Sequence, residues 1–191
     1  MVRHTLALFA ISACAMASAQ RAEPFVARGL VSGSASIGPG FMVDHPLTNI
    51  YVTGDAQYFL EDRISLQGSA AWYVGAQQDS TFLKENSRVS FGPVYHFTKG
   101  GLDVGLGFLP GVSLTQLEPV GQDLPATPLK LLPNASLSGS VTYYVWKYMH
   151  FFANVRYVHA QYTAAAITPL PLDELVLTAG LGWQLRMWKK K

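Results

Sequence analysis

Histidines and carboxylates are the side chains of this sequence that could act as acids, bases or metal ligands. The five histidines are spread along 191 residues, and no group of His, Asp and Glu has the spacing that a metal site requires. His96 and His150 are therefore interpreted as structural residues with satisfied hydrogen bonds. Gly105 and Gly107 are interpreted as packing positions in a strand, because they do not form a phosphate-binding loop. The sequence predicts neither a metal site nor a cofactor.

Six charged residues stand among small polar residues on faces that alternate with apolar ones, and these are the candidate functional side chains. Four are arginines and two are aspartates, so opposite charges are available to pair. A charge that protein encloses without a partner is poorly solvated. We therefore predict an interior network of hydrogen bonds and ion pairs if these faces enclose a space. The six residues are Arg28, Asp55, Arg88, Asp103, Arg156 and Arg186.

The segment from Glu174 to Trp188 is the element around which the chain is organised. From Leu175 to Met187 every second residue is apolar or Ala, and this period of two predicts a β-strand. Its length of about 13 residues exceeds the roughly 9–11 that a tilted strand needs to cross a bilayer. If this strand closes a barrel against the first one, the upstream segments must repeat its pattern.

Seven earlier segments do repeat it, and short turns alternate with long loops between them. Gly38-Pro39-Gly40 is interpreted as the end of the first strand. The long loops cover approximately residues 38–47, 76–86, 116–132 and 163–173. A meander with two such unlike ends is typical of barrels with short periplasmic turns and longer extracellular loops. The seven predicted strands cover approximately residues 29–37, 49–60, 64–74, 88–98, 102–108, 134–145 and 150–157.

Composition agrees with a membrane barrel. Charged residues make up 14% of the chain, against roughly 25% in soluble domains. No internal apolar run approaches the roughly 20 residues of a membrane helix. The net charge of +2 does not indicate nucleic acid binding, and Lys189 to Lys191 are interpreted as a solvated tail.

The apolar face of the predicted strands is assigned to the outside. The alternative is a soluble, lipocalin-like binding barrel, which has an apolar interior and a polar exterior. An eight-stranded barrel has an interior just wide enough for side chains. The small residues of the polar faces fit that space, whereas Trp72, Phe91, Phe108 and Trp183 would overfill it. We therefore expect the apolar face to meet lipid.

Aromatic residues on this outer face cluster toward the end with the tight turns. Tryptophan and tyrosine girdles mark the membrane boundary in proteins of this kind. The residues of this predicted girdle are Tyr58, Tyr95, Phe97, Tyr143, Phe151 and Trp183.

Residues 1–19 are predicted to be a signal peptide, followed by one barrel domain over residues 20–191. Arg3 precedes an apolar centre, and Ala17-Ser18-Ala19 fits an A-x-A cleavage pattern. Ile11-Ser12-Ala13-Cys14 also resembles a lipoprotein signal, in which Cys14 would be lipidated. If cleavage follows Ala19, the mature chain has no cysteine and folds without disulfides.

The pattern after Gln20 resembles the small eight-stranded outer-membrane barrels of the OmpA/OmpX type. The resemblance implies an all-β, antiparallel, up-and-down transmembrane barrel in the bacterial outer membrane. It also implies that Gly182, Leu185 and Met187 of the closing strand act as an assembly signal for the β-barrel assembly machinery. Such signals commonly end on an aromatic residue, whereas Trp188 is followed here by three lysines.

Two weaker resemblances concern enzymes. Residues 156–161 are similar to the His-x-Ser strand of the lipid A deacylase barrels, with His159 as the histidine. Gln161 occupies the nucleophile position, however, and glutamine cannot form an acyl-enzyme. His45, Asp79 and Ser80 are similar to loop residues of the lipid A palmitoyltransferase barrels, but nothing else matches that family.

The sequence therefore favours a non-enzymatic small outer-membrane barrel with a plugged lumen. Its expected role is structural, or is an interaction or adhesion through the extracellular loops. The expected partners are outer-membrane lipid and lipopolysaccharide, the assembly machinery, and a protein bound by the loops. A lipid A-modifying enzyme and a narrow porin-like channel remain the alternatives, beside the soluble lipocalin-like barrel.

Overall fold

A computed structural model describes residues 25–78, 82–118, 127–164 and 167–187. The predicted signal peptide and Cys14 lie outside these residues. Within the described ranges, no helix is long and apolar enough to cross a membrane. The strands are β1 (Leu30–Met42), β2 (Thr48–Phe59), β3 (Ile64–Ala76), β4 (Leu83–Lys99), β5 (Leu102–Leu117), β6 (Lys130–Tyr144), β7 (Met149–Ala164), β8 (Ile167–Pro171) and β9 (Glu174–Arg186).

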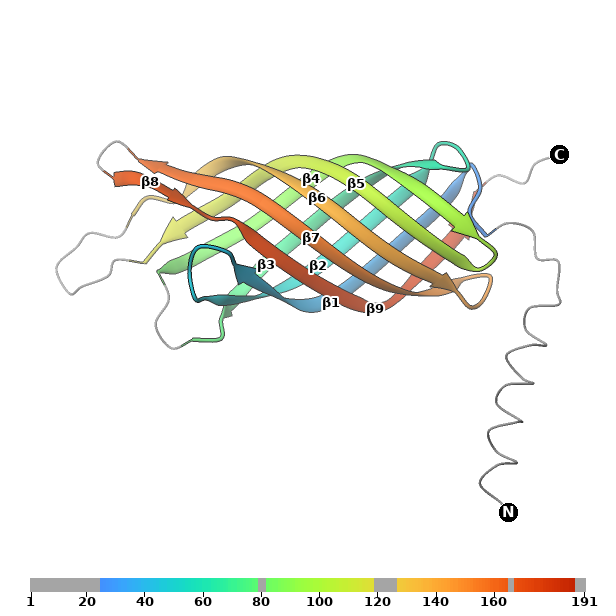
Figure 1. Ribbon diagram of the computed structural model, residues 1–191, viewed down its shortest axis with the longest axis horizontal. Coiled ribbons are helices and arrows are strands. Elements are labelled where there is room, and N and C mark those ends of the chain that lie inside the picture. The colour runs from blue at the N-terminus through green and yellow to red at the C-terminus, as the bar shows by residue number, and fades with distance from the viewer. Residues whose placement is uncertain (1–24, 79–81, 119–126, 165–166, 188–191) are drawn as a thin grey trace, which may run out of the picture.

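The strands form one closed antiparallel barrel (Figure 1). Consecutive strands pair from β1 to β7, and β1 pairs with β9 while β9 pairs with β7. The short β8 pairs with the same β7 and precedes β9 directly in the chain. Together β8 and β9 therefore occupy the position of the eighth strand of the barrel. The predicted eight-stranded, all-β, up-and-down barrel is confirmed.

The barrel has two unlike ends. At the turn end the connections are short, spanning residues 60–63, 100–101 and 145–148. At the loop end the connections span residues 43–47, 77–82 and 118–129, and β8 lies in the fourth. β1 begins and β9 ends at the turn end (Figure 1). The connections at the loop end are longer than those at the turn end, as predicted, but those over residues 43–47 and 77–82 are shorter than the predicted loops of residues 38–47 and 76–86.

The predicted end of the first strand at Gly38-Pro39-Gly40 is wrong, because β1 continues to Met42. Pro39 pairs with Ile50 of β2. The pairing of β1 with β9 stops at Ser34 and resumes at Gly40. Proline cannot donate a backbone hydrogen bond, and it is tolerated here because it falls in this interruption of the ladder.

Strands also extend further toward the loop end than predicted. β4 begins at Leu83, β5 ends at Leu117, and β6 begins at Lys130. Pro110 and Pro133, which suggest loop, both lie inside paired strands. The alternation continues past them, since Val112, Leu114 and Leu131 are exposed on the outer wall.

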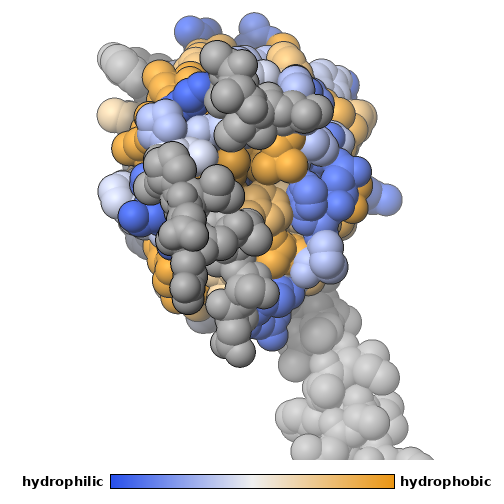
Figure 2. Space-filling model, turned by 90° about the vertical axis from the view of Figure 1, so that its left-hand side faces the viewer, coloured by the Kyte–Doolittle hydropathy of each residue, from blue (hydrophilic) through white to orange (hydrophobic). Residues whose placement is uncertain are grey.

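The outer wall is apolar, as predicted. Trp72 is 70% exposed, and Phe91, Phe108 and Trp183 are also exposed. Figure 2 looks at the loop end and shows apolar atoms around the outline of the barrel. The six residues of the predicted girdle are all exposed. A soluble barrel would place these side chains inside, so the lipocalin-like arrangement is contradicted.

The lumen is layered, which the sequence did not predict. Near the loop end an apolar cluster fills it, with Leu47, Tyr73, Leu83 and Tyr162 among its buried members. A second cluster of Val26, Leu30, Phe59 and Tyr144 fills the turn end. Polar and charged side chains occupy the space between, so the interior is sealed by apolar packing at each end.

Candidate functional site in the barrel lumen

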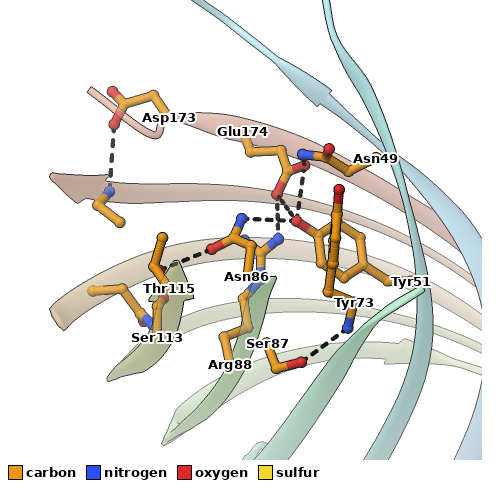
Figure 3. A network of polar contacts seen from close by, with 12 residues as sticks. Asn49, Tyr51, Tyr73, Asn86, Ser87, Arg88, Ser113, Thr115, Asp173 and Glu174 are labelled. Carbon is orange, nitrogen blue, oxygen red and sulfur yellow. Dashed lines mark hydrogen bonds and ion pairs between the residues drawn. The ribbon is translucent and has the colours of Figure 1, made fainter. Parts of the chain in front are cut away.

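The buried ion pair of Arg88 and Glu174 is the centre of the polar lumen nearest the loop end (Figure 3). Arg88 comes from β4 and Glu174 opens β9, and both side chains are almost completely buried. The hydroxyl of Tyr51 lies 2.9 Å from Oε2 of Glu174 and donates to the carboxylate. Nδ2 of Asn49 donates to Oε1 over 2.7 Å. The carboxylate is therefore held by a cation and two neutral donors.

Further hydrogen bonds and a ring contact connect this pair to neighbouring strands. Nδ2 of Asn86 donates to the Tyr51 hydroxyl over 2.9 Å, and Thr115 donates to Oδ1 of Asn86 over 3.2 Å. The guanidinium carbon of Arg88 lies 4.5 Å from the centroid of the Tyr51 ring, a distance that gives a cation–π contact. Strands β2, β4, β5 and β9 are thus linked across the lumen by side chains.

Asp55 and Arg156 form the middle layer. Nη2 of Arg156 lies 3.0 Å from Oδ1 of Asp55, and Gln67 donates to the same oxygen over 2.9 Å. Arg156 also donates to the hydroxyl of Ser69. A small polar cavity beside this layer is lined by Asp55, Gln57, His150, Asn154 and other residues. The ion pair therefore bridges β2 and β7 across the barrel.

His96 and Asp103 form the layer nearest the turn end. Nδ1 of His96 lies 2.7 Å from Oδ2 of Asp103, and Thr98 donates to Oδ1 over 2.8 Å. The hydroxyl of Ser65 lies 2.8 Å from Nε2 of His96. Ser65, His96 and Asp103 thus stand in the order of a nucleophile, a base and an orienting acid.

This order does not make a catalytic site, because an ester could not reach the serine. Ser65 is fully buried and His96 is buried. The ring of Phe59 packs on His96 with centroids 4.6 Å apart. Nε2 of Gln57 donates to the Ser65 hydroxyl over 2.6 Å. The arrangement links β2, β3, β4 and β5, which is a structural role.

The structure distributes the six predicted lumen residues over separate groups. Asp55 and Arg156 pair with each other, whereas Arg88 pairs with Glu174 and Asp103 with His96. Arg28 and Arg186 lie exposed at the turn end, outside the buried groups. This placement corrects the expectation of one interior network of six, because both arginines sit where the strands reach the mouth of the barrel.

Sequence reasoning missed the partners of these charges. Glu174 and Tyr51 both lie at inward positions of the two-residue period, but the predicted network did not include them. The signal was available for Glu174, since it lies two residues before Val176 on the buried face of β9. For His96 the signal was its inward position opposite Gly105.

The residues of the predicted assembly signal lie on both faces of β9. Gly182 faces the lumen, where an added Cβ would overlap the ring of His150. His150 in turn bonds Oε1 of Gln184 through Nδ1 over 2.6 Å. Leu185 and Met187 are exposed on the outer wall.

Of the residues that carry the two enzyme resemblances, the structure describes His45, His159 and Gln161. His159 is 66% exposed by side chain on the outer wall, and its Nδ1 lies 2.7 Å from Oδ1 of Asp173. Tyr157 donates to the other oxygen of Asp173 over 2.6 Å. His45 packs edge-on against Phe82, and Asp79 and Ser80 lie outside the described residues. Among the residues that the structure covers, no three potential metal ligands of the His, Cys, Asp or Glu type converge.

Comparison with known proteins places this barrel among outer-membrane proteins by fold. No protein-family model matches the sequence, and no curated protein matches it. The N-terminal β-barrel domain of Pseudomonas aeruginosa OprF is 18% identical, with a TM-score of 0.57 over 83% of this chain and 99% of that one. Neisserial surface protein A is 12% identical, with a TM-score of 0.59 over 83% of this chain and 96% of that one.

The attachment invasion locus protein Ail of Yersinia pestis gives a similar result. It is 11% identical, with a TM-score of 0.53 over 83% of this chain and 99% of that one. Ail is also known in complex with the heparin analogue sucrose octasulfate. At these identities the comparisons establish the architecture. The chain has the fold of the small eight-stranded outer-membrane β-barrels.

Proposed function

We propose that this protein spans the bacterial outer membrane as a closed, non-enzymatic barrel and acts through its loop end. The observation that carries the proposal is the combination of an apolar outer wall with a lumen that buried apolar clusters close near both ends. The wall supplies a surface for lipid, and the clusters at both ends leave no open route for a solute. What remains available to partners outside the cell is the loop end.

The charge of the loop end restricts the partner. Outside the lumen, the described residues there include four carboxylates and two lysines. The sequence of the loops adds Asp79 and Asp123 and no cation. Such a surface does not favour a sulfated or phosphorylated polyanion, so we infer that the partner is a protein with a neutral or basic surface. The carboxylates are Asp44, Glu85, Glu118 and Asp173, and the lysines are Lys84 and Lys130.

The connection from β5 to β6 is the favoured contact. Pro119, Pro125 and Pro128 restrict its backbone. Its base is anchored to the barrel, because Thr127 accepts from the backbone N–H of Leu117 and donates to the Leu117 carbonyl, both over 2.8 Å. An anchored, stiffened segment loses less conformational entropy on binding a partner.

Deleting residues 119–126 tests this role. We expect the shortened protein to lose capture of its partner in a cross-linking pull-down from intact cells. The barrel should remain folded and heat-modifiable on a gel, because the deletion spares every strand. A matched deletion of residues 79–81 is the control and should retain capture. Equal capture by the wild type and the 119–126 deletion would contradict the assignment of this loop.

A lipid A-modifying activity is the second candidate, and the exposed pair of His159 and Asp173 is the observation that favours it. Under the proposed function, His159→Ala and Ser80→Ala leave the lipid A mass spectrum of the host unchanged. If either variant removed an acyl-chain modification of lipid A that the wild type produces, the protein would be an enzyme instead.

We further propose that the assembly machinery recognises the closing strand through Gly182, Leu185 and Met187.

A further inference from the structure

The turn end of the barrel carries a group of exposed cations. Among the described residues that are exposed at this end, there are five cations and two carboxylates, Glu61 and Asp62. Asp62 is engaged by the backbone N–H of Arg28 over 3.1 Å. Two of the cations lie in short turns, one ends β4 beside the third turn, and the other two lie just before β1 and at the end of β9. This basic collar consists of Arg28, Arg63, Lys99, Lys147 and Arg186, all of them exposed.

The collar lies where the apolar wall ends. Lys99 pairs with Leu102 across its turn, and Arg186 pairs with Leu30 at the start of β1. Lys147 stands between Trp146 and Tyr148, which are 62% and 54% exposed. Its Nζ lies 5.2 Å from the centroid of the Tyr148 ring. Cations and amphipathic rings thus share one level, which is the arrangement found at the boundary of a membrane.

We propose that the basic collar binds the phosphates of anionic phospholipid headgroups in the periplasmic leaflet. The proposal rests on the membrane location proposed above. Lys and Arg side chains form charge-assisted hydrogen bonds with phosphate, and each cation near an anionic lipid surface contributes to binding. The aromatic rings of the turn between β6 and β7 place the cations at headgroup depth.

The opposite end of the barrel strengthens this assignment. Carboxylates outnumber lysines at the loop end, so the same attraction is missing there. Lys130, moreover, donates to the carbonyl of Thr163 over 2.8 Å. The charge difference between the two ends therefore favours anionic lipid in the leaflet at the turn end.

The test measures lipid contact of the full mature chain by quenching of tryptophan fluorescence. Trp146 adjoins Lys147 in sequence, and Trp183 pairs with Met149 at the same end. The protein is refolded in phosphatidylcholine vesicles that contain brominated phosphatidylglycerol or brominated phosphatidylcholine. We expect the anionic lipid to bind at least about fivefold better, the gain that one cation at the surface provides. Added salt should reduce this preference.

The variant R63Q/K99Q/K147Q removes three charges of the collar with little change of size. Its preference should fall toward equality, whereas the control K84Q at the loop end should keep the preference of the wild type. Equal binding of both lipids by the wild type, or an unchanged preference in the triple variant, would overturn the proposal.

Two further outcomes distinguish lipid binding by the collar from a failure of the membrane location and from binding of an anionic polymer. If neither brominated lipid quenches the wild type, the protein is not in the bilayer, and the proposed membrane location fails first. If the wild type in detergent binds purified peptidoglycan and the triple variant does not, the collar recognises an anionic polymer, and the lipid assignment is overturned.

Discussion

Replacing Glu174 with alanine is expected to lower the free energy of unfolding by about 3–5 kcal/mol, the usual cost of removing one partner of a buried ion pair. The carboxylate is fully buried and pairs with Arg88. Its loss leaves a buried guanidinium without its anion and also removes the acceptor of Asn49 and Tyr51. Urea titration of the refolded protein in lipid vesicles, followed by tryptophan fluorescence, measures the change.

The double variant R88M/E174L is the matched control. It removes both charges and fills their space with apolar side chains, so it should recover most of the lost stability. A double-mutant cycle of the wild type, R88M, E174L and R88M/E174L gives the interaction energy of the pair. A cost below about 1 kcal/mol for Glu174→Ala, the range of an exposed ion pair, would show that the pair is solvated and the lumen open.

Replacing Leu106 with arginine should destabilise the barrel by about 2–4 kcal/mol, the cost of a cation at the middle of the lipid-facing wall. Leu106 is 55% exposed on the outer face of β5. It lies four residues from the turn end of that strand, near the middle of the segment that a bilayer covers. Urea titration of the refolded protein in lipid vesicles measures this change in the free energy of unfolding.

Leu102→Arg provides the control for depth. Leu102 begins β5 beside the turn and pairs with Lys99 and Tyr143, so arginine there should cost only about 0–1 kcal/mol, as near an interface. Equal effects at the two positions would mean that no gradient of polarity crosses the wall. The apolar band would then not be a lipid surface.

The architecture could be predicted because its signal is local. The alternation of Leu102 to Phe108 specifies a strand with its apolar face on one side. The alternation of short and long connections specifies two unlike ends. Sequence reasoning failed at Pro39, because the cost of a proline depends on whether a neighbouring strand requires its N–H. That depends on register, which a single sequence does not show.

The candidate site could be predicted only as a set of inward-facing charges. Asp55 and Arg156 lie on inward positions, but they are 101 residues apart in the chain, and their contact depends on the closure and tilt of the barrel. Glu174 was missed as the partner of Arg88 for the same reason. The apolar clusters at the two ends are also products of closure, since their members come from connections and strand ends on opposite sides of the lumen.

Planar-bilayer recording of the purified monomer tests the closed membrane barrel most directly. The ion pairs and the two apolar clusters block the lumen at several levels. Inserted protein, confirmed by its heat-modifiability, should therefore give no stable conductance at any moderate voltage. Steady channels of the order of nanosiemens from the wild-type monomer, the behaviour of wider, water-filled porins, would contradict a closed lumen and support a channel.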